Sequence, residues 1–408
     1  MDAEALERTY RSEATKLRAA LARRLGDVGL AEELVQDAFV AALEHWKAGG
    51  VPPNPGGWLM TTAWRKAIDR QRRASAGQEK LALLAVTQER SQPGPAGPEG
   101  GDQDDEMLSL IFACCHPALP DDAQVALTLR AVCGLTTAEI AASFLVSEQA
   151  MGQRLSRARR RLSDAGVAVR VPEPDELGER LAAVLAVVYL VFNEGYLASA
   201  GRTPARRDLA AQALSLARLL HRLMPREPEA AGLLALLMLH ESRAAARFDG
   251  WGRLIRLAEQ DRRQWDSPLA TEASALLDRA IRLRQPGPYQ IQAAIAALHS
   301  SAPAYEETDW PQIRLLYDRL QSMTPSPVVL LNRAVATRFA LGPQAALDEV
   351  DLLAGELAAY RLFHAVRAEL LAALGRDDEA RAANERALAL AANPAERELI
   401  ARRLQTSP

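Results

Sequence analysis

The sequence has little cysteine, no long apolar run and no hydrophobic segment typical of a signal peptide, and each absence excludes a class of protein. Three cysteines in 408 residues, at no repeated spacing, do not form a disulfide framework. The longest apolar run, residues 181–192, is shorter than the roughly twenty residues that span a bilayer, so we predict a buried helix there. The amino terminus has no apolar segment typical of a signal peptide. These absences predict a cytoplasmic protein without a membrane partner.

Catalytic and nucleotide-binding motifs are also missing. The six histidines are scattered, neither Gly-x-x-x-x-Gly-Lys-Ser/Thr nor Gly-x-Gly-x-x-Gly occurs, and no serine lies in a nucleophile elbow. Cys114, Cys115 and His116 are the only clustered soft ligands, and adjacent residues rarely ligate one metal well. We interpret them as buried thiols in a helix, with a structural metal or redox switch as the alternative. The sequence therefore predicts no enzyme, no cofactor and no metal.

Helix-forming sequence is what the chain has in abundance. The hydrophobic content is 49%, and strand patterns are scarce, so we predict an all-α protein of two or three domains. The net charge of −3 hides a local asymmetry. Basic residues crowd the ends of two predicted helices, near residues 65–73 and 154–161, and such clusters suit a polyanionic partner.

Residues 121–162 have the pattern of a helix-turn-helix. Gly134 can end the first helix, and Thr136 with Glu139 forms a capping box that opens a short second helix. Ser147 is a good N-cap for the third helix. The coincidence of capping, turn length and a basic tail favours DNA binding over the alternative, an ordinary surface helix with a solvated basic face.

The third helix has one apolar face and one polar face. Met151, Leu155, Ala158 and Leu162 recur at helical spacing and form the predicted buried face. Amides can hydrogen-bond to base edges, and arginines can hold phosphates. The predicted DNA-contacting residues are Ser147, Glu148, Gln149, Gln153, Arg154, Arg157, Arg160 and Arg161.

The amino-terminal part predicts three helices. The second, starting near residue 30, has an expected exposed acidic face at Glu32, Glu33, Gln36 and Asp37, which serves either for solvation or for docking a basic partner. A loop at residues 49–57 separates it from the third helix.

In that third helix aromatic residues alternate with basic ones. Trp58 and Trp64 lie among Arg65, Lys66, Arg70, Arg72 and Arg73. Aromatic faces beside cations suit unstacked bases and single-stranded phosphates. The alternative is a core Trp58 with a basic last turn that the helix dipole favours.

Three segments, LAEELVQDAF, PGGWLMTTAWRKAIDRQRR and LTTAEIAASFLVSEQAMGQRLSRARRRL, resemble those of extracytoplasmic-function (ECF) sigma factors of bacterial RNA polymerase, in the same order and spacing. The resemblance implies core RNA polymerase and promoter DNA as partners. It implies docking on the polymerase clamp through Glu32, Glu33, Gln36, Asp37 and Val40. It implies minus-ten contacts from Asn54, Trp58, Trp64, Arg65, Lys66, Arg70, Arg72 and Arg73, and minus-35 contacts from the helix that begins after Ser147. The family commonly has Arg then Asn where this chain has Trp64 and Arg65.

The carboxyl-terminal half predicts helical pairs separated by prolines. In residues 359–394, Ala368, Gly375, Ala380 and Ala387 occupy the small-residue positions of a tetratricopeptide repeat. A tetratricopeptide-like solenoid would offer a concave surface to a protein or peptide. Such an extension resembles that of one ECF subgroup, as do the segments FACCHPAL and FNEGY. The predicted domains are residues 1–75, a flexible acidic linker at 76–106, the helix-turn-helix domain at 107–170 and the solenoid at 171–408.

The favoured hypothesis is an alternative sigma factor that the solenoid regulates. The main alternative is a one-component transcription activator whose solenoid senses a ligand or a protein, and the third is a scaffold. An activator does not need the acidic helix ahead of an aromatic and basic one, and this block therefore favours the sigma factor. We expect the extension to support activity, because the apolar helix at 181–192 is typical of a packed junction; masking of the DNA-binding face is the alternative.

Overall fold

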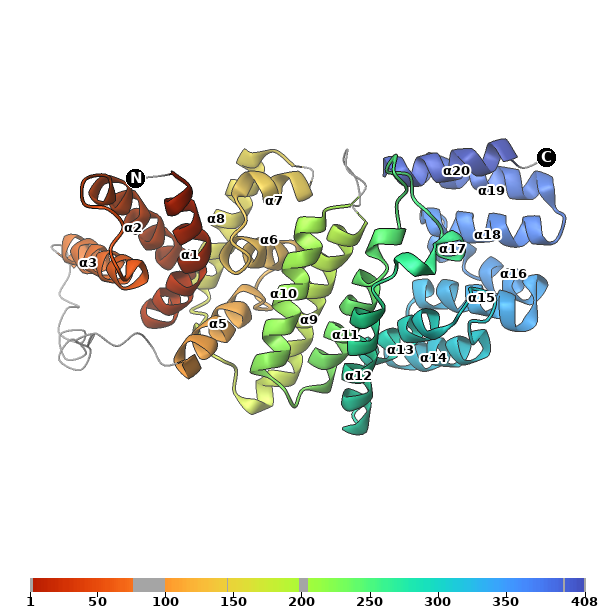
Figure 1. Cartoon of the computed structure of the whole chain (residues 1–408), viewed down its shortest axis with the longest axis horizontal. Helices are drawn as coiled ribbons and strands as arrows, with labels where there is room; N and C mark the ends of the chain where they lie inside the picture. Colours follow the sequence, from red (N-terminus) through yellow and green to blue (C-terminus); the bar gives the residue numbers. More distant parts are fainter. Residues whose placement is uncertain (1–2, 76–99, 145, 198–204, 392, 407–408) are drawn as a thin grey trace. The chain divides into compact units, whose positions relative to one another are not determined.

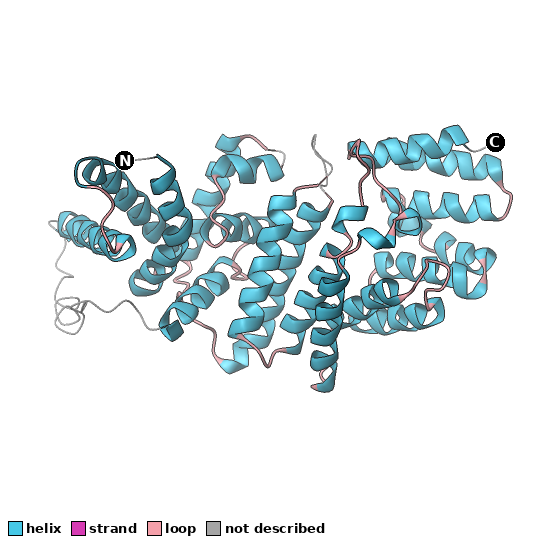
Figure 2. Ribbon diagram, in the orientation of Figure 1, coloured by secondary structure: helices cyan, strands magenta, loops and turns pink. Residues whose placement is uncertain are grey.

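The computed structural model describes residues 3–75, 100–144, 146–197, 205–391 and 393–406. Over these residues the regular structure is helical and includes no β-strand, apart from an isolated bridge between Phe248 and Leu254 (Figure 2). The all-α prediction is confirmed. Within the same ranges, no helix is long and apolar enough to cross a membrane. The chain divides into two compact units, Met1–Val188 and Tyr189–Pro408.

The first unit contains seven labelled helices and the first part of an eighth (Figure 1). They are α1 (Ala3–Leu25), α2 (Val28–Gly49), α3 (Pro55–Ser75), α5 (Gly100–Cys114), α6 (Asp121–Ala131), α7 (Thr137–Ser143), α8 (Glu148–Asp164) and α9 (Pro174–Tyr196). Because α5 starts at Gly100, the acidic end of the predicted linker is helical, which corrects the expected flexible segment there. Residues 76–99 of that linker lie outside the described residues.

The core of the first unit forms where α1 packs against α2 and α5. Ala14, Leu17 and Leu21 are the buried stripe of α1 that the sequence predicts. Gly26 follows with a φ of +69°, a conformation that glycine adopts without a Cβ clash, and lets the chain turn into α2. Full burial of one leucine side chain contributes about 1.5–3 kcal/mol to stability, so these layers hold the unit together.

The thiols belong to this core. Cys114 and Cys115 are buried, and burial raises the pKa of Cys115 to about 12. A protonated, buried thiol is a poor nucleophile and a poor metal ligand. The interpretation as buried thiols is confirmed, with the Sγ of Cys115 lying 3.5 Å from the Oγ1 of Thr128.

The division between the units falls within α9, after Val188, and not at the predicted position near residue 170. The guanidinium of Arg180 donates a 2.6 Å hydrogen bond to the carbonyl of Phe112 in α5. The first part of α9 therefore belongs to the first unit. The predicted helix is formed and its stripe of Leu181, Val184, Val188 and Phe192 is buried, whereas Leu190 is 47% exposed, so the segment is buried on one side only.

The second unit is a succession of helices, several of which begin with proline. The bounds are α10 (Arg207–Leu223), α11 (Pro228–Glu241), η1 (Ala244–Ala246), η2 (Leu257–Glu259), η3 (Arg262–Gln264), α12 (Ser267–Arg282), α13 (Pro288–Ser301), α14 (Trp310–Met323), α15 (Pro327–Leu341), α16 (Pro343–Asp351), α17 (Ala354–Leu357), α18 (Arg361–Ala373), α19 (Asp377–Leu390) and α20 (Pro394–Thr406). Proline suits the first helical position because its missing N–H would have no partner there.

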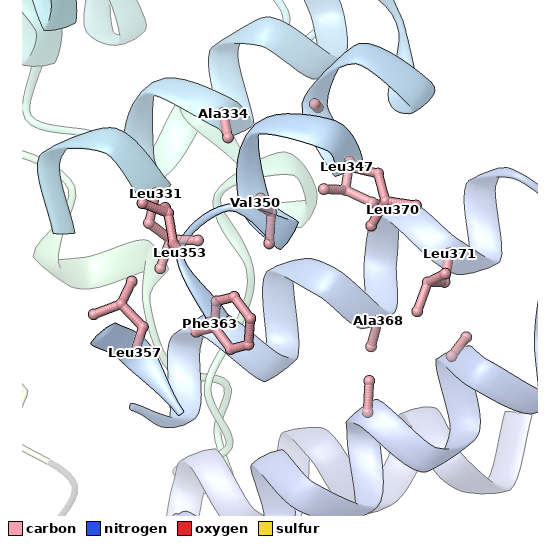
Figure 3. Close-up of a cluster of buried hydrophobic side chains, with 13 residues drawn as sticks. Leu331, Ala334, Leu347, Val350, Leu353, Leu357, Phe363, Ala368, Leu370 and Leu371 are labelled. Atoms are coloured by element: carbon pink, nitrogen blue, oxygen red, sulfur yellow. The ribbon is translucent and has the colours of Figure 1, made fainter. Parts of the chain in front are cut away.

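Neighbouring helices of this unit pack through leucine and small residues. Leu331, Leu347, Val350, Phe363 and Leu370 meet between α15, α16 and α18 (Figure 3). The predicted small residues Ala368, Ala380 and Ala387 are buried, and Gly375 has a φ of +72° between α18 and α19. Small side chains allow these two helices to approach closely. The assignment as a tetratricopeptide-like solenoid stays a prediction.

Candidate nucleic-acid interface

Local capping builds the helix-turn-helix as the sequence predicts. Gly134 has a φ of +73° after α6. The N–H of Thr136 donates to Glu139 Oε2 at 2.7 Å, and the N–H of Glu139 donates to Thr136 Oγ1 at 3.2 Å, so the capping box is formed. Ser147 Oγ accepts from the N–H of Ala150 and caps α8. These caps satisfy backbone donors that helix formation leaves unpaired.

Helix α8 buries its apolar face and exposes its polar face. Met151, Leu155, Ala158 and Leu162 are all at most 5% exposed, which confirms the predicted stripe. The opposite face carries the exposed residues Gln149, Gln153, Arg157 and Arg160, with exposed Arg161 beside it, and Ser147 and Glu148 are exposed at the amino-terminal end of the helix. In the described part of the chain, no carboxylate lies within ion-pair distance of these three arginines. Their charge is therefore directed to solvent.

Two other arginines of α8 are held inside the unit. Arg154, a predicted DNA contact, pairs with Asp122 at 3.1 Å and lies over the ring of Phe144. The side chain of Arg159 is 27% exposed and pairs with Glu32. The guanidinium of Arg154 thus already has a protein partner, unlike those of Arg157 and Arg160.

Helix α2 exposes an acidic and apolar face. Asp27 Oδ1 caps the helix by accepting from the N–H groups of residues 29 and 30. Glu33, Gln36 and Asp37 are exposed, and Val40 is 54% exposed at the next turn. Leu43, 40% exposed, extends this face and was missed in the sequence, although its spacing of three residues from Val40 is the signal.

Glu32 does not lie on that exposed face, and the sequence-based expectation was wrong. Its side chain is 5% exposed and accepts at 2.5 Å from both Arg130 Nε and Arg159 Nη1. The amino-terminal end of α2 packs against α8, and burial of a carboxylate there requires cationic partners. Glu32 therefore links α2 to the helix-turn-helix.

Arg18 forms a second link that the sequence analysis missed. It is 4% exposed and donates to the carbonyls of Arg130 and Ala131, at 2.9 and 2.6 Å. These carbonyls belong to the last turn of α6, where the helix dipole favours a cation. A charged residue on the otherwise apolar face of α1 is the only signal the sequence offers.

The start of α3 shows structural roles for two predicted DNA contacts. The amide oxygen of Asn54 accepts from the N–H of Gly57 at 2.9 Å, which caps the helix. Trp58 is half-buried, and its ring lies 5.3 Å from that of buried Trp46. Both residues thus position α3, as the core alternative for Trp58 predicts.

The remaining predicted minus-ten residues follow along α3. Trp64 and Lys66 are half-buried and Arg65 is exposed. Arg70 is exposed and pairs with Glu33 of α2 at 2.6 Å. Arg72 and Arg73 fall in the last turns of α3, where the side chains lie outside the described residues.

Comparison with known proteins matches the same segments. Residues 9–77 match Sigma-70 region 2, residues 109–162 match Sigma-70 region 4, and residues 180–281 match a family of unknown function (DUF6596). An ECF RNA polymerase sigma factor, SigK of Mycolicibacterium vanbaalenii, is 31% identical over 34% of this chain and 70% of its own length. The chain belongs to the ECF family of sigma factors. It is an alternative sigma factor that directs transcription initiation.

This ECF sigma factor also resembles an uncharacterized protein of Rhizobium meliloti (strain 1021). The two are 48% identical over 92% of this chain and 90% of the relative. The likeness therefore extends through the carboxyl-terminal unit. No solved structure matches the chain. Membership in the sigma-70 family makes the protein a transcription factor and implies binding to core RNA polymerase and promoter DNA.

Proposed function

We propose that the exposed face of α8 recognises the minus-35 element. Gln149 and Gln153 would hydrogen-bond to base edges, and Arg157, Arg160 and Arg161 would hold phosphates. The supporting observation is that these side chains are exposed together, while the apolar face of α8 is buried. Arg154 would contribute less, because Asp122 already binds its guanidinium.

We propose further that α2 docks on the clamp of the polymerase. Glu33, Gln36 and Asp37 provide acceptors, and Val40 with Leu43 provides exposed apolar surface beside them. A surface with a small apolar centre and a charged rim is typical of protein interfaces. Trp64, Arg65 and Lys66 on α3 would then face the minus-ten bases, with phosphates held by the basic last turns.

The ion pairs of Glu32 suggest that this structure is a closed form. The minus-ten and minus-35 elements lie about 25 base pairs apart, which is roughly 85 Å at about 3.4 Å per base pair. Two helices joined by a 2.5 Å ion pair cannot span that distance. We propose that α2 and α8 separate when the protein binds polymerase and promoter, and that Glu32 stabilises the closed form.

We propose that the carboxyl-terminal unit supports activity of the same chain. A large separate core with its own buried clusters is typical of a control element. Since the first part of α9 packs with the first unit, a truncated chain should end at Val188. Such a chain, if circular dichroism shows that its helices are formed, should lose activity in transcription. Higher activity than that of the full chain would instead identify the second unit as an inhibitor.

Run-off transcription with core polymerase tests the central proposal. The full chain, core enzyme and genomic fragments should give promoter-specific transcripts without another sigma factor. No such transcript, with folded protein and active core, would contradict it. Spin labels at exposed Glu44 and Ser163 test the opening: their separation should increase by tens of ångströms on binding core and promoter. An unchanged distance would contradict the closed-form proposal without affecting the proposed sigma function.

A further inference from the structure

The second unit contains a cluster of three arginines, two of them buried and one half-buried, that lies outside the proposed DNA-binding and docking surfaces. The arginine cluster, as we define it, comprises Arg243, Arg247, Arg262, His240, His299 and Trp265. Its members come from the end of α11, the two residues that flank η1, the segment at η3 and the last turn of α13. Arg243 is 7% exposed and Arg247 is 8% exposed. Arginine is seldom buried to this degree without a carboxylate partner.

Close contacts hold these residues together. The guanidinium carbons of Arg243 and Arg262 lie 5.8 and 4.5 Å from the ring centre of Trp265. Arg262 also donates to the carbonyls of His299 and Ala302, at 2.7 and 2.8 Å. Arg247 donates to the carbonyl of Tyr196 and lies over its ring. The cluster is therefore fixed by packing and by backbone acceptors.

The cluster carries a positive charge that the described residues do not neutralise. Arg243 Nη2 donates to His240 Nδ1 at 2.7 Å, and because a guanidinium only donates, this imidazole is neutral. Burial and the neighbouring arginines lower the pKa of His299 to about 4, so it is also neutral at pH 7. Guanidinium groups stay protonated in proteins, so the cluster is cationic.

No carboxylate in the described ranges lies within ion-pair distance of Arg243, Arg247 or Arg262. Glu306 and Glu396 act on Arg262 and Arg247 only at longer range. Glu396 is itself paired with Arg361 at 2.5 Å. The residues of this unit outside those ranges include no Asp or Glu.

Several buried donors in the cluster have no acceptor. They are Arg243 Nε, Arg262 Nη2 and Trp265 Nε1, and His299 Nδ1 is also without a partner. Buried polar atoms are nearly always hydrogen-bonded, so a group of unpaired donors indicates an absent acceptor. Three of these four atoms can only donate. A ligand that matches these unpaired donors would have several acceptor oxygens and a negative charge.

We propose that the arginine cluster is a binding site for a small oxyanion, the phosphate or carboxylate of a metabolite. Guanidinium groups match the geometry of both anions and can bind them through paired hydrogen bonds. The surrounding rings reduce access of water, which strengthens such bonds. Recognition of this kind provides the second unit with a small-molecule ligand of its own, separate from DNA and polymerase.

Thermal unfolding of the full chain tests this site, with inorganic phosphate and succinate as the two probes. Each probe is added in the millimolar range to chloride buffers of equal ionic strength. We expect one probe, at about a hundredfold excess over its dissociation constant, to raise the Tm of the second unit by about 5 °C. A rise with phosphate identifies a phosphorylated ligand, and a rise with succinate identifies a carboxylate. No rise with either probe overturns the proposal.

Two variants and a matched control separate binding from general salt effects. Arg262→Gln and Arg243→Met should abolish the rise, while Arg263→Gln should keep it, because Arg263 is the adjacent residue but its side chain is 91% exposed. In chloride alone, Arg243→Met should be at least as stable as the wild type, since it removes a buried charge that has no carboxylate partner. An equal rise in Arg262→Gln and wild type, or loss of stability in Arg243→Met regardless of the anion, would show a purely structural cluster.

Discussion

Each unit contains a group of arginines for which the described residues supply no carboxylate partner, and the two groups differ in exposure. In the first unit this group lies on the exposed face of α8, at Arg157, Arg160 and Arg161. In the second unit Arg243 and Arg247 are buried. An exposed row of charges can follow an extended polyanion, whereas a buried group can surround only a small one. The contrast therefore separates a DNA-binding surface from a ligand site.

Both units also contain arginines with carboxylate partners, which shows that the contrast is not a matter of composition. Glu32 in the first unit binds Arg130 and Arg159. In the second unit Glu349 binds Arg333 at 3.1 Å and lies 3.8 Å from Arg314. Carboxylate pairs therefore join helices in both units, and backbone carbonyls do so as well, as Arg180 shows at Phe112.

The largest effect should come from breaking the ion pairs of Glu32. Glu32→Gln leaves two partly buried guanidinium groups without their carboxylate and should lower the free energy of unfolding of the first unit by about 3–5 kcal/mol. Urea unfolding followed by circular dichroism measures this change. Glu33→Gln is the matched control, because its pair with Arg70 is half-exposed and should contribute less than about 1 kcal/mol. Equal effects of the two variants would show that burial of Glu32 contributes nothing.

Acid should affect the second unit through His299. Its pKa falls from an ordinary value of 6.5 to about 4 in the folded protein, because burial and Arg243 disfavour the charged imidazole. The contribution of neutral His299 is complete above pH 6.5 and is lost as the pH falls toward 4, by about 3 kcal/mol at the acid end. Urea unfolding of the second unit between pH 7 and 4 measures it. His299→Gln should reduce this dependence, while neutral His240, whose pKa burial also lowers, keeps part of it. An unchanged slope in that variant would contradict the assignment.

Local features of both units could be predicted from the sequence because each depends on residues a few positions apart. The capping box of Thr136 and Glu139 and the stripe from Met151 to Leu162 are of this kind. Burial of Glu32 was not predictable, since its partners lie 98 and 127 residues away in the chain. Two adjacent acidic residues such as Glu32 and Glu33 are typical of a solvated face. Only tertiary packing shows that Glu32 is buried and Glu33 is exposed.

The same limit applies to the arginine cluster and to part of the DNA-binding surface. Arg243, Arg247 and Arg262 are ordinary basic residues in the sequence, and His299 lies 37 positions from Arg262. Asn54 was predicted as a DNA contact, whereas its local role as a helix cap appears only with the backbone geometry. The boundary within α9 depends on a contact between Arg180 and Phe112, which no local pattern indicates.

The exposed face of α8 should contain some residues that determine which DNA sequence is bound and others that determine only the affinity for DNA. Gln153→Ala should change base preference at one minus-35 position by about 1–3 kcal/mol. Arg157→Ala should weaken binding to all sequences alike and reduce the salt slope by about 0.9. Selection of bound sequences and salt titrations measure the two effects. Arg154→Ala is the control for an arginine that already has a protein partner. Because Asp122 binds the guanidinium of Arg154, removal of Arg154 should change the salt slope less than removal of Arg157.

The smallest effect should come from charge reversal on α2, outside both groups of arginines. Asp37 is exposed, and Asp37→Arg should leave helicity unchanged while weakening core polymerase binding about tenfold, mostly through slower association at low salt. Glu385→Arg, an equal charge reversal at an exposed position of α19, should leave the affinity for core polymerase unchanged. Equilibrium binding of labelled protein to core enzyme measures both variants. Wild-type affinity in Asp37→Arg would show that the docking surface lies elsewhere. Equal weakening in both variants would show an effect of net charge, because only a local interface distinguishes one reversed carboxylate from another.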